Sequence, residues 1–315
     1  MEKYDLIIIG AGPAGLAASI YASRYKINHL VLGQTLGGTI VLAHKVENYP
    51  GYSSLSGFEL AENFLKHAQG LGGKIVNQEV INLEKVDNFW TLTAGDQKQY
   101  QAKAVIIATG TERKKLNVPG EEKYLGKGVS YCATCDAAFY KEKDVVVAGG
   151  ANSACSGALY LSRFARKVYL IYRKDNLKAD PVWVNEIKTA KNIEVIYQTN
   201  ITAILGNEQK VTSIKIDQPY QNQNEISVAG VFIEIGGIPI INLAKKLGIK
   251  IDKENFVLVD QSMATNIPGI FCAGDVNDWQ KHHQQVVVAT AEGAIAAASA
   301  YQFLCNPQQK DRFSC

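Results

Sequence analysis

The sequence predicts an α/β fold with two nucleotide-binding domains, because one strand–turn–helix–strand pattern occurs twice along the chain. The first copy begins at Asp5 and ends in a short strand at 30–32, and the second begins at Asp144 and ends in a strand at 168–171. Both leading strands are continuous apolar runs, which is typical of strands buried on both faces of a parallel sheet. Two such βαβ units in one chain imply two nucleotide sites.

Two polar segments indicate that one domain is inserted in the other. Residues 111–120 are mostly polar and contain a proline, and 236–239 read Gly-Gly-Ile-Pro. Such segments are typical of connections between packed elements. We therefore expect an inserted domain at 115–243, flanked by one discontinuous domain made of 1–114 and 244–315.

Composition restricts the classes of function. The 315 residues are 47% hydrophobic and carry a formal net charge of only +3, so neither nucleic acid nor a membrane surface is an expected partner. The N-terminal apolar run stops at Gly10, which is too short for a signal peptide. The apolar segment from Val286 to Leu304 contains Glu292 and reads as a buried helix. We expect a cytoplasmic protein, in which six cysteines do not form a structural disulfide framework.

The first glycine-rich turn has the complete fingerprint of a dinucleotide site. Gly10, Gly12 and Gly15 follow a strand and open a helix. One glycine permits the sharp turn, one lets the backbone approach the pyrophosphate, and one allows close packing of helix and strand. The acidic residue that usually binds the ribose is missing, because the next strand ends at Gly33 and Gln34.

The second turn is a reduced version of the first. Ala151 stands in place of the middle glycine, and Ala154 occupies the third position, which tolerates alanine. Three cations follow the next strand: Arg173, Lys174 and Lys178. They suit a 2′-phosphate better than a bare ribose, although a solvated basic turn is the alternative interpretation.

Cys132 and Cys135 form the sharpest local signal. Residues three apart in a helix lie close enough for a disulfide, and a helix N-terminus lowers the pKa of a thiol. Half of a zinc site is the alternative, but no second ligand pair stands at a suitable spacing. Asp136 follows directly and is either a general acid or a carboxylate that stabilises the first helical turn. The other cysteines are expected to be inert core residues (Cys155, Cys272 and Cys305) or an incidental terminal thiol (Cys315).

Further motifs occur in a specific order: Val46 to Gly51, Ala108-Thr109-Gly110, Gly274-Asp275-Val276 and Gln285 to Ala297. With the first glycine turn and the Cys-Ala-Thr-Cys-Asp motif, they make the chain resemble the low-molecular-weight thioredoxin reductases over essentially its full length. The resemblance implies two Rossmann-like domains of the three-layer ββα type. An FAD-binding domain would be interrupted by an NAD(P)-binding-like domain that carries the cysteine pair. It also implies a homodimer whose partner is thioredoxin or a thioredoxin-like protein.

The resemblance assigns roles to individual residues. Cys135 would face the flavin, Cys132 would attack the thioredoxin disulfide, and Asp136 would be the acid. The FAD site would be formed by Gly10, Gly12, Pro13, Ala14, Gly15, Gln34, Gly38, Thr39, Asn48, Val80, Ala108, Thr109, Gly110, Gly274, Asp275, Gln284, Gln285 and Val286. The NADPH site would be formed by Asn152, Ser153, Ala154, Arg173, Lys174 and Lys178.

Nearly all departures from the family pattern cluster on the pyridine-nucleotide side. They are Ala151 for a third consecutive glycine, Ser156 and Gly157 for two acidic residues, Tyr172 for a histidine, Lys174 and Lys178 for two arginines, and Gln284 for an arginine. These changes leave the FAD and cysteine motifs intact and bear on the electron donor.

NADPH is the expected donor, from the three cations, and ferredoxin or another donor is the alternative. Two other functions stay open: an FAD dithiol oxidase, and a non-enzymatic FAD protein that responds to redox state by binding. A flavin ferredoxin reductase is disfavoured because it has no use for the cysteine pair.

Overall fold

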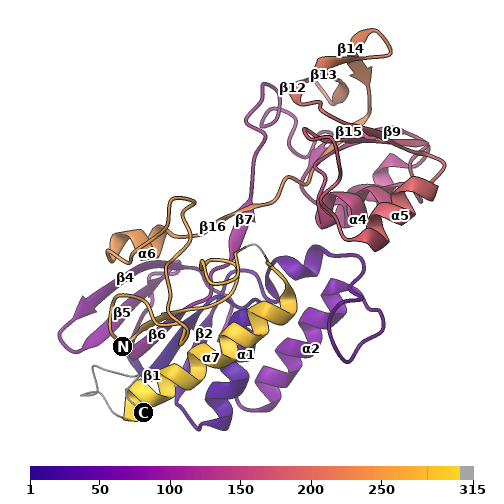
Figure 1. Cartoon of the computed structure of the whole chain (residues 1–315). Helices are drawn as coiled ribbons and strands as arrows, with labels where there is room; N and C mark the ends of the chain where they lie inside the picture. The colour runs from indigo at the N-terminus through magenta and orange to yellow at the C-terminus, as the bar shows by residue number, and fades with distance from the viewer. Residues whose placement is uncertain (282, 306–315) are drawn as a thin grey trace. The chain divides into compact units, whose positions relative to one another are not determined.

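The chain folds into two compact units, each with its own sheet (Figure 1). The computed structural model describes residues 1–281 and 283–305. Unit 1 comprises Met1–Val41, Val46–Glu112 and the chain from Pro239 onward, and unit 2 comprises Leu42–Lys45 and Arg113–Ile238. The chain therefore leaves unit 1 and returns to it, as expected when one unit is inserted in the other.

Unit 1 is built on a seven-stranded sheet in the order β3-β2-β1-β6-β5-β4, with β17 also paired to β6. Its strands are β1 (Glu2–Ile9), β2 (His29–Leu32), β3 (Lys74–Val76), β4 (Val80–Val86), β5 (Phe89–Ala94), β6 (Gln99–Ile107) and β17 (Ile270–Cys272). Its helices are α1 (Pro13–Arg24), the 3₁₀ helix η1 (Gly38–Leu42), α2 (Gly57–Gly70), α6 (Asn242–Lys246) and α7 (Val286–Cys305). Parallel pairing joins β3, β2, β1, β6 and β17, whereas β4 and β5 are antiparallel.

Alternate side chains of β1 bury on opposite faces of this sheet. Leu6 and Ile8 pack with the alanines of α1 and α7, whereas Ile7 and Ile9 pack with β4, β5 and the segment around α6. Figure 1 shows α1, α2 and α7 together over one face of the sheet. Burial on both faces explains why β1 is apolar at successive positions.

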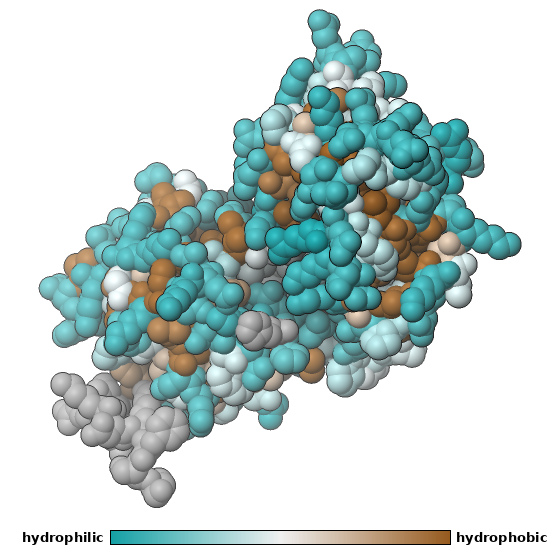
Figure 2. All heavy atoms as spheres, turned by 45° about the horizontal axis from the view of Figure 1, so that its top comes forward, coloured by the Kyte–Doolittle hydropathy of each residue, from teal (hydrophilic) through white to brown (hydrophobic). Residues whose placement is uncertain are grey.

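Helix α7 is long and apolar enough to cross a membrane by length and composition. In the structure its small residues pack along α1, and Gly293 approaches so closely that a Cβ there would lie 2.0 Å from the Ala14 carbonyl oxygen. It therefore acts as a core helix of unit 1. Polar residues cover most of the face drawn in Figure 2, with smaller apolar areas between them.

Unit 2 is built on a five-stranded parallel sheet in the order β11-β10-β9-β15-β8. Its strands are β8 (Val129–Ser130), β9 (Asp144–Ala148), β10 (Lys167–Ile171), β11 (Ile193–Ile196) and β15 (Gly230–Ile233). A second, antiparallel sheet contains β12 (Ile201–Gly206), β13 (Val211–Tyr220) and β14 (Gln223–Ser227). The helices are α3 (Ala133–Asp136), the 3₁₀ helix η2 (Ala137–Tyr140), α4 (Asn152–Leu161) and α5 (Pro181–Thr189), and a two-stranded sheet joins β7 (Thr111–Arg113) to β16 (Gly237–Pro239).

The same alternation organises unit 2 in three layers. Val145 and Val147 of β9 face the helices, and Val146 and Ala148 face the antiparallel sheet. Strands β13 and β14 of this second layer pair as an antiparallel hairpin. The predicted fold class, two Rossmann-like units with one inserted in the other, is confirmed.

Candidate functional site

The three glycines of the first turn have different physical requirements. Gly10 has φ +119°, and a Cβ there would lie 2.0 Å from the Ala108 carbonyl oxygen. A Cβ at Gly15 would lie 1.9 Å from the Gly10 carbonyl oxygen. At Gly12, with φ −83°, a Cβ would meet only the Gly38 Cα at 3.6 Å. The protein backbone therefore excludes side chains at Gly10 and Gly15, whereas Gly12 borders free space.

The N-terminus of α1 is open to an anion. Gly12 is its N-cap, no side chain caps the first turn, and that turn contains no acidic residue. Free backbone N–H groups and the helix dipole there favour a phosphate group. The turn therefore fits the pyrophosphate of a dinucleotide.

Other predicted FAD residues come together from distant parts of unit 1. The Asn48 side chain donates a hydrogen bond to the Gln285 Oε1 at 2.9 Å, across 237 sequence positions. The Gln284 Nε2 donates to the Asp275 carbonyl oxygen at 3.2 Å. The Thr109 Oγ1 donates to the Ile240 carbonyl oxygen, just after β16, at 2.8 Å. The structure thus joins Asn48 and the turn after β17 to the residues just before α7, and the end of β6 to the segment before α6.

The remaining predicted residues occupy varied positions. Pro13 and Ala14 begin α1, Gln34 and Thr39 are exposed on the segment after β2, and Val286 begins α7. Gly110 has φ +65° after β6. Val80 is buried in the core at the start of β4, so its side chain packs against protein.

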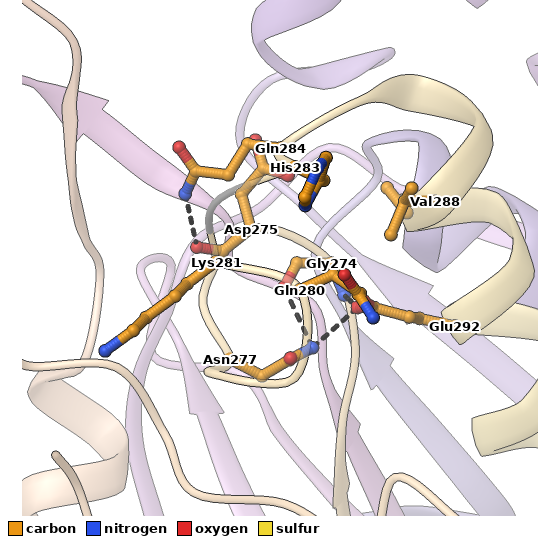
Figure 3. Close-up of a pocket in the computed structure, with 10 residues that line it drawn as sticks. Gly274, Asp275, Asn277, Gln280, Lys281, His283, Gln284, Val288 and Glu292 are labelled. Atoms are coloured by element: carbon orange, nitrogen blue, oxygen red, sulfur yellow. Dashed lines mark hydrogen bonds between the residues drawn. The ribbon is translucent and has the colours of Figure 1, made fainter. Parts of the chain in front are cut away.

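A small pocket next to the β17 turn contains Gly274, Asp275 and Gln284 (Figure 3). Beneath it, the buried Glu292 of α7 accepts hydrogen bonds from the Gly274 N–H at 2.7 Å and from the Asn277 Nδ2 at 2.6 Å. Burial raises the pKa of Glu292. Glu292 and Asn277 were not predicted, and together they hold the turn that presents Asp275.

The Asp275 carboxylate is chemically suited to bind a ligand. It is partly buried, burial raises its pKa to about 6, and within 1–281 and 283–305 its side chain makes no hydrogen bond. A desolvated carboxylate without a donor is costly unless a ligand supplies one. A sugar-alcohol hydroxyl supplies such a donor, so this turn and the open α1 N-terminus fit FAD.

The second glycine turn repeats the backbone of the first. Gly149 has φ +139°. Ala151 is the N-cap of α4 with φ −104° and ψ −173°, and Gly12, the N-cap of α1, has φ −83° and the same ψ. The Ala151 methyl group is exposed where Gly12 leaves free space. Ala154 is buried against Gly149, and the Asn152 amide pairs with Asp180, while Ser153 is exposed.

The three predicted cations lie beside this turn. The Lys178 N–H donates to the Gly150 carbonyl oxygen at 2.7 Å, which brings the 172–178 loop back to the turn. Lys178 and then Arg173 lower the pKa of Lys174, because like charges are close together. Such crowding of cations is stabilised by a bound anion.

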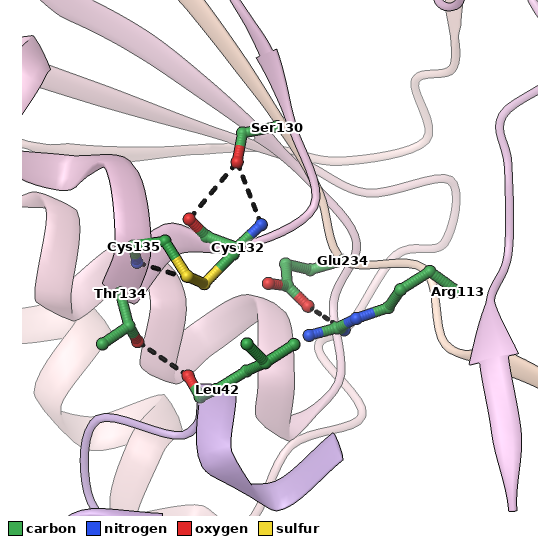
Figure 4. The surroundings of a disulfide bond; sticks show 7 residues. All are labelled: Leu42, Arg113, Ser130, Cys132, Thr134, Cys135 and Glu234. Carbon is green, nitrogen blue, oxygen red and sulfur yellow. Dashed lines mark hydrogen bonds and ion pairs between the residues drawn. A yellow bond between two sulfur atoms is a disulfide. The ribbon is translucent and has the colours of Figure 1, made fainter. Parts of the chain in front are cut away.

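Cys132 and Cys135 form a disulfide with a Cα–Cα distance of 5.3 Å (Figure 4). Cys132 is the N-cap of α3, and its Sγ accepts a hydrogen bond from the Cys135 N–H at 3.1 Å. The Ser130 hydroxyl binds both the N–H and the carbonyl oxygen of Cys132, and the Thr134 hydroxyl donates to the Leu42 carbonyl oxygen at 2.8 Å. Asp136 is the last residue of α3 and is partly exposed.

The other cysteines separate into two groups. Burial raises the pKa of the Cys155 thiol to about 12 and that of Cys272 well above its usual value, so both are inert core residues. The expectation that Cys305 is buried is wrong: it ends α7 beyond the packed part of the helix and is exposed. Cys315 lies outside the described residues.

Known proteins resemble this chain over almost its full length. Residues 4–293 match the family described as pyridine nucleotide-disulphide oxidoreductase. The thioredoxin reductase of Listeria innocua is 40% identical over 303 residues, which cover 96% of this chain and 94% of the relative. The thioredoxin reductase of Treponema pallidum is 41% identical and covers 96% of this chain and 97% of its own length.

A solved structure agrees with these relatives. The thioredoxin reductase of Lactococcus lactis has a TM-score of 0.91 and 36% identity, with 96% of this chain and 99% of that chain covered. The two glycine turns, the Cys132–Cys135 disulfide and the similarity over almost the whole chain therefore all point to the same family. The chain belongs to the pyridine nucleotide-disulphide oxidoreductase family, and within it to the low-molecular-weight thioredoxin reductases.

Proposed function

We propose that this enzyme reduces the disulfide of a thioredoxin with electrons from NADPH, and that the Cys132–Cys135 pair carries them to the protein substrate. The observation that supports this most directly is the disulfide at the start of α3, in the unit that also holds the second glycine turn. A disulfide three residues apart on a short helix constrains little of the fold. Its value is therefore chemical.

Unit 1 is proposed to bind FAD and unit 2 the nicotinamide donor. Gly12 and the α1 N-terminus would hold the pyrophosphate, and Asp275, oriented by Glu292 and Asn277, would bind a hydroxyl of the ribityl chain. When bound, FAD supplies the two-electron chemistry that connects the nicotinamide to the disulfide.

The two cysteines are proposed to act in sequence once they are reduced. The Cys132 thiolate attacks one sulfur of the thioredoxin disulfide, which forms a mixed disulfide and releases the other thioredoxin sulfur as a thiolate. Cys135 then attacks the Cys132 sulfur, releases the second thioredoxin thiol and restores the Cys132–Cys135 disulfide. Two electrons and two protons pass to thioredoxin. The Cys135 N–H beside the Cys132 Sγ supports Cys132 as the nucleophile, because a backbone donor stabilises a thiolate.

Asp136 is proposed to exchange protons with this pair. It is adjacent to Cys135 in sequence and lies at the end of α3, where solvent can supply the proton. Its proposed role is to protonate the leaving thiolate.

NADPH is the proposed donor, and the cation cluster at 173–178 supports it. Ala151 is the feature that favours an alternative donor such as ferredoxin, because its exposed methyl group stands where Gly12 of the first turn leaves free space. An anaerobic titration with NADPH, NADH and reduced ferredoxin, followed by flavin bleaching, distinguishes these donors. Bleaching by ferredoxin alone would replace NADPH in the proposal, and rapid oxygen uptake with a dithiol would favour a dithiol oxidase.

Replacing each cysteine tests the role of the pair. Cys132→Ser should abolish electron transfer to thioredoxin and leave flavin reduction by the donor unchanged. Cys155→Ser, at a buried thiol, is the matched control and should retain transfer. Transfer that survives in Cys132→Ser would overturn the assignment, and a reduced enzyme that reduces no thioredoxin would favour a redox-responsive binding protein.

The proposal includes a cytoplasmic homodimer that acts without nucleic acid or membrane. Size-exclusion chromatography with light scattering tests the dimer. A monomeric enzyme with full activity would remove it from the proposal.

A further inference from the structure

A buried ion pair lies beside the disulfide in unit 2. Glu234 follows β15, and its side chain is 5% exposed. The Arg113 Nη1 donates to its Oε2 at 2.5 Å, and the Arg113 side chain is 28% exposed. Figure 4 shows the Glu234 carboxylate between the disulfide and the Arg113 guanidinium.

The same carboxylate lies beside the backbone of the redox helix. The amide of Ala133, the first residue of α3, is close enough to Glu234 to oppose slightly the rise in its pKa that burial causes. Helix α4 also packs against the Glu234 side chain, because a Cβ at Gly157 would lie 3.9 Å from the Glu234 Cγ. Glu234 is therefore enclosed by β7, α3 and α4, with its charge directed toward the residue that follows Cys132.

Such an ion pair costs solvation free energy, so a purely structural role is a weak explanation. Burying a charged pair is often no better for stability than burying apolar residues of similar volume. The pKa of Glu234 also lies near neutral pH. Burial raises this pKa to about 7, and Arg113 opposes this rise. Its charge therefore depends on Arg113 in the pH range in which thiols ionise.

We propose that Glu234, held by Arg113, is a positioning residue for the redox-active cysteines: it anchors the Ala133 backbone and places a balanced pair of charges behind the Cys132 and Cys135 sulfur atoms, which sets how readily the reduced thiols ionise. This inference rests on the proposed redox role of the disulfide. The balance has a direction. Loss of the carboxylate leaves a cation near the sulfurs and favours thiolate. Loss of the guanidinium raises the pKa of Glu234 further, so the unpaired carboxyl becomes an anion only at more alkaline pH, and there it disfavours thiolate.

Glu234→Gln and Arg113→Gln test this balance with opposite expected signs. The reduced protein is alkylated across a range of pH, and mass spectrometry follows the rate at Cys132. Glu234→Gln should lower the thiol pKa by about one unit, which gives roughly tenfold more thiolate below that pKa. Arg113→Gln should raise it by less, because the unpaired Glu234 is an anion only at the alkaline end of the pH range, and the double variant should return close to the parent value.

Two further measurements separate charge from structure. Equilibration with a dithiol–disulfide buffer should show Glu234→Gln shifted toward the reduced form, because a stabilised thiolate makes a disulfide more oxidising. Asp144→Asn breaks the Arg166–Asp144 ion pair elsewhere in unit 2 and should leave the thiol pKa unchanged. Asp136, the charged residue of α3 itself, stays intact in every variant.

The outcomes are decisive in either direction. An unchanged thiol pKa in Glu234→Gln, or a shift of the same sign in Arg113→Gln, would overturn the proposal. Should Glu234→Gln not fold, the sign of the shift in Arg113→Gln still decides. Alkylation requires no thioredoxin, so a failure of the proposed function appears in turnover and a failure of this inference appears in the pH profile.

Discussion

Substitution of Gly12 and of Gly15 by alanine should separate the binding of FAD from the folding of unit 1. Both residues belong to one fingerprint, but their surroundings differ. A Cβ at Gly15 would lie 1.9 Å from a backbone oxygen, whereas at Gly12 the nearest atom is 3.6 Å away. We expect Gly15→Ala to destabilise the apoprotein and Gly12→Ala to weaken FAD binding in a stable protein.

The magnitudes follow from these distances. At Gly15 the obstacle is the Gly10 carbonyl, which cannot rotate away, so the cost should be near the upper end for overpacking, about 3 kcal/mol. That corresponds to a fall of roughly 6–12 °C in the melting temperature. At Gly12, the lower entropy of unfolded alanine offsets the poorer N-cap, which leaves stability within about 0.5 kcal/mol. The methyl group would displace the pyrophosphate from one charge-assisted hydrogen bond, about 1.5–3 kcal/mol, or roughly 10–100-fold in affinity.

Thermal unfolding of the apoproteins measures the first effect, and titration with FAD, followed by quenching of flavin fluorescence, measures the second. Gly51→Ala is a control for backbone strain alone, since Gly51 has φ +99° with nothing within 4 Å of its Cβ position. It should lose stability and keep its FAD affinity. Equal destabilisation by Gly12→Ala and Gly15→Ala, or unchanged FAD affinity in Gly12→Ala, would refute the reasoning.

Two further predictions concern charged groups at the two sites. The folded-state pKa of Asp275, about 6, is above that of an unfolded aspartate, so this group should cost the apoprotein stability as pH rises from about 4 to 6. Asp275→Asn should therefore stabilise the apoprotein at pH 7 by up to about 3 kcal/mol, flatten that pH dependence in thermal unfolding and weaken FAD binding. A destabilised variant at pH 7 would contradict this. Combined Lys174→Gln and Lys178→Gln should raise the KM for NADPH by ~10-fold and leave the KM for NADH unchanged, with Lys188→Gln on α5 as the control. An equal loss for both nucleotides in steady-state assays would assign these lysines to general attraction of anions.

The fold could be predicted because the central parallel strands of both main sheets are buried on two faces. Such strands must be apolar at successive positions, and this makes β1 and β9 visible in the sequence next to their glycine turns. The disulfide was visible for a similar reason, since its two cysteines are only three positions apart. These signals are local in sequence, and local signals need no knowledge of tertiary contacts.

The residues that the sequence did not reveal act across long separations. Glu292 reads as a polar interruption of an apolar helix, and only the tertiary structure places it below the Gly274 turn. Glu234 is preceded by a strand and followed by a glycine pair, so nothing nearby marks it as the partner of Arg113, 121 positions away. The misplacement of Cys305 has the opposite cause: the apolar pattern of α7 continues past the point where the core ends.

The two glycine turns indicate how the nicotinamide side of this enzyme has diverged. Gly149 remains where φ is +139° and a Cβ would lie 2.2 Å from the Glu234 carbonyl oxygen, so the fold itself requires it. Ala151 stands at the position equivalent to Gly12. The backbone conformation there suits alanine, and a methyl group would clash only with a bound pyrophosphate. Gly149 could be replaced only if the second turn no longer mattered for folding. Ala151 therefore stands where a bound ligand, and not the chain, sets the requirement, and we expect this departure to act on the choice of electron donor.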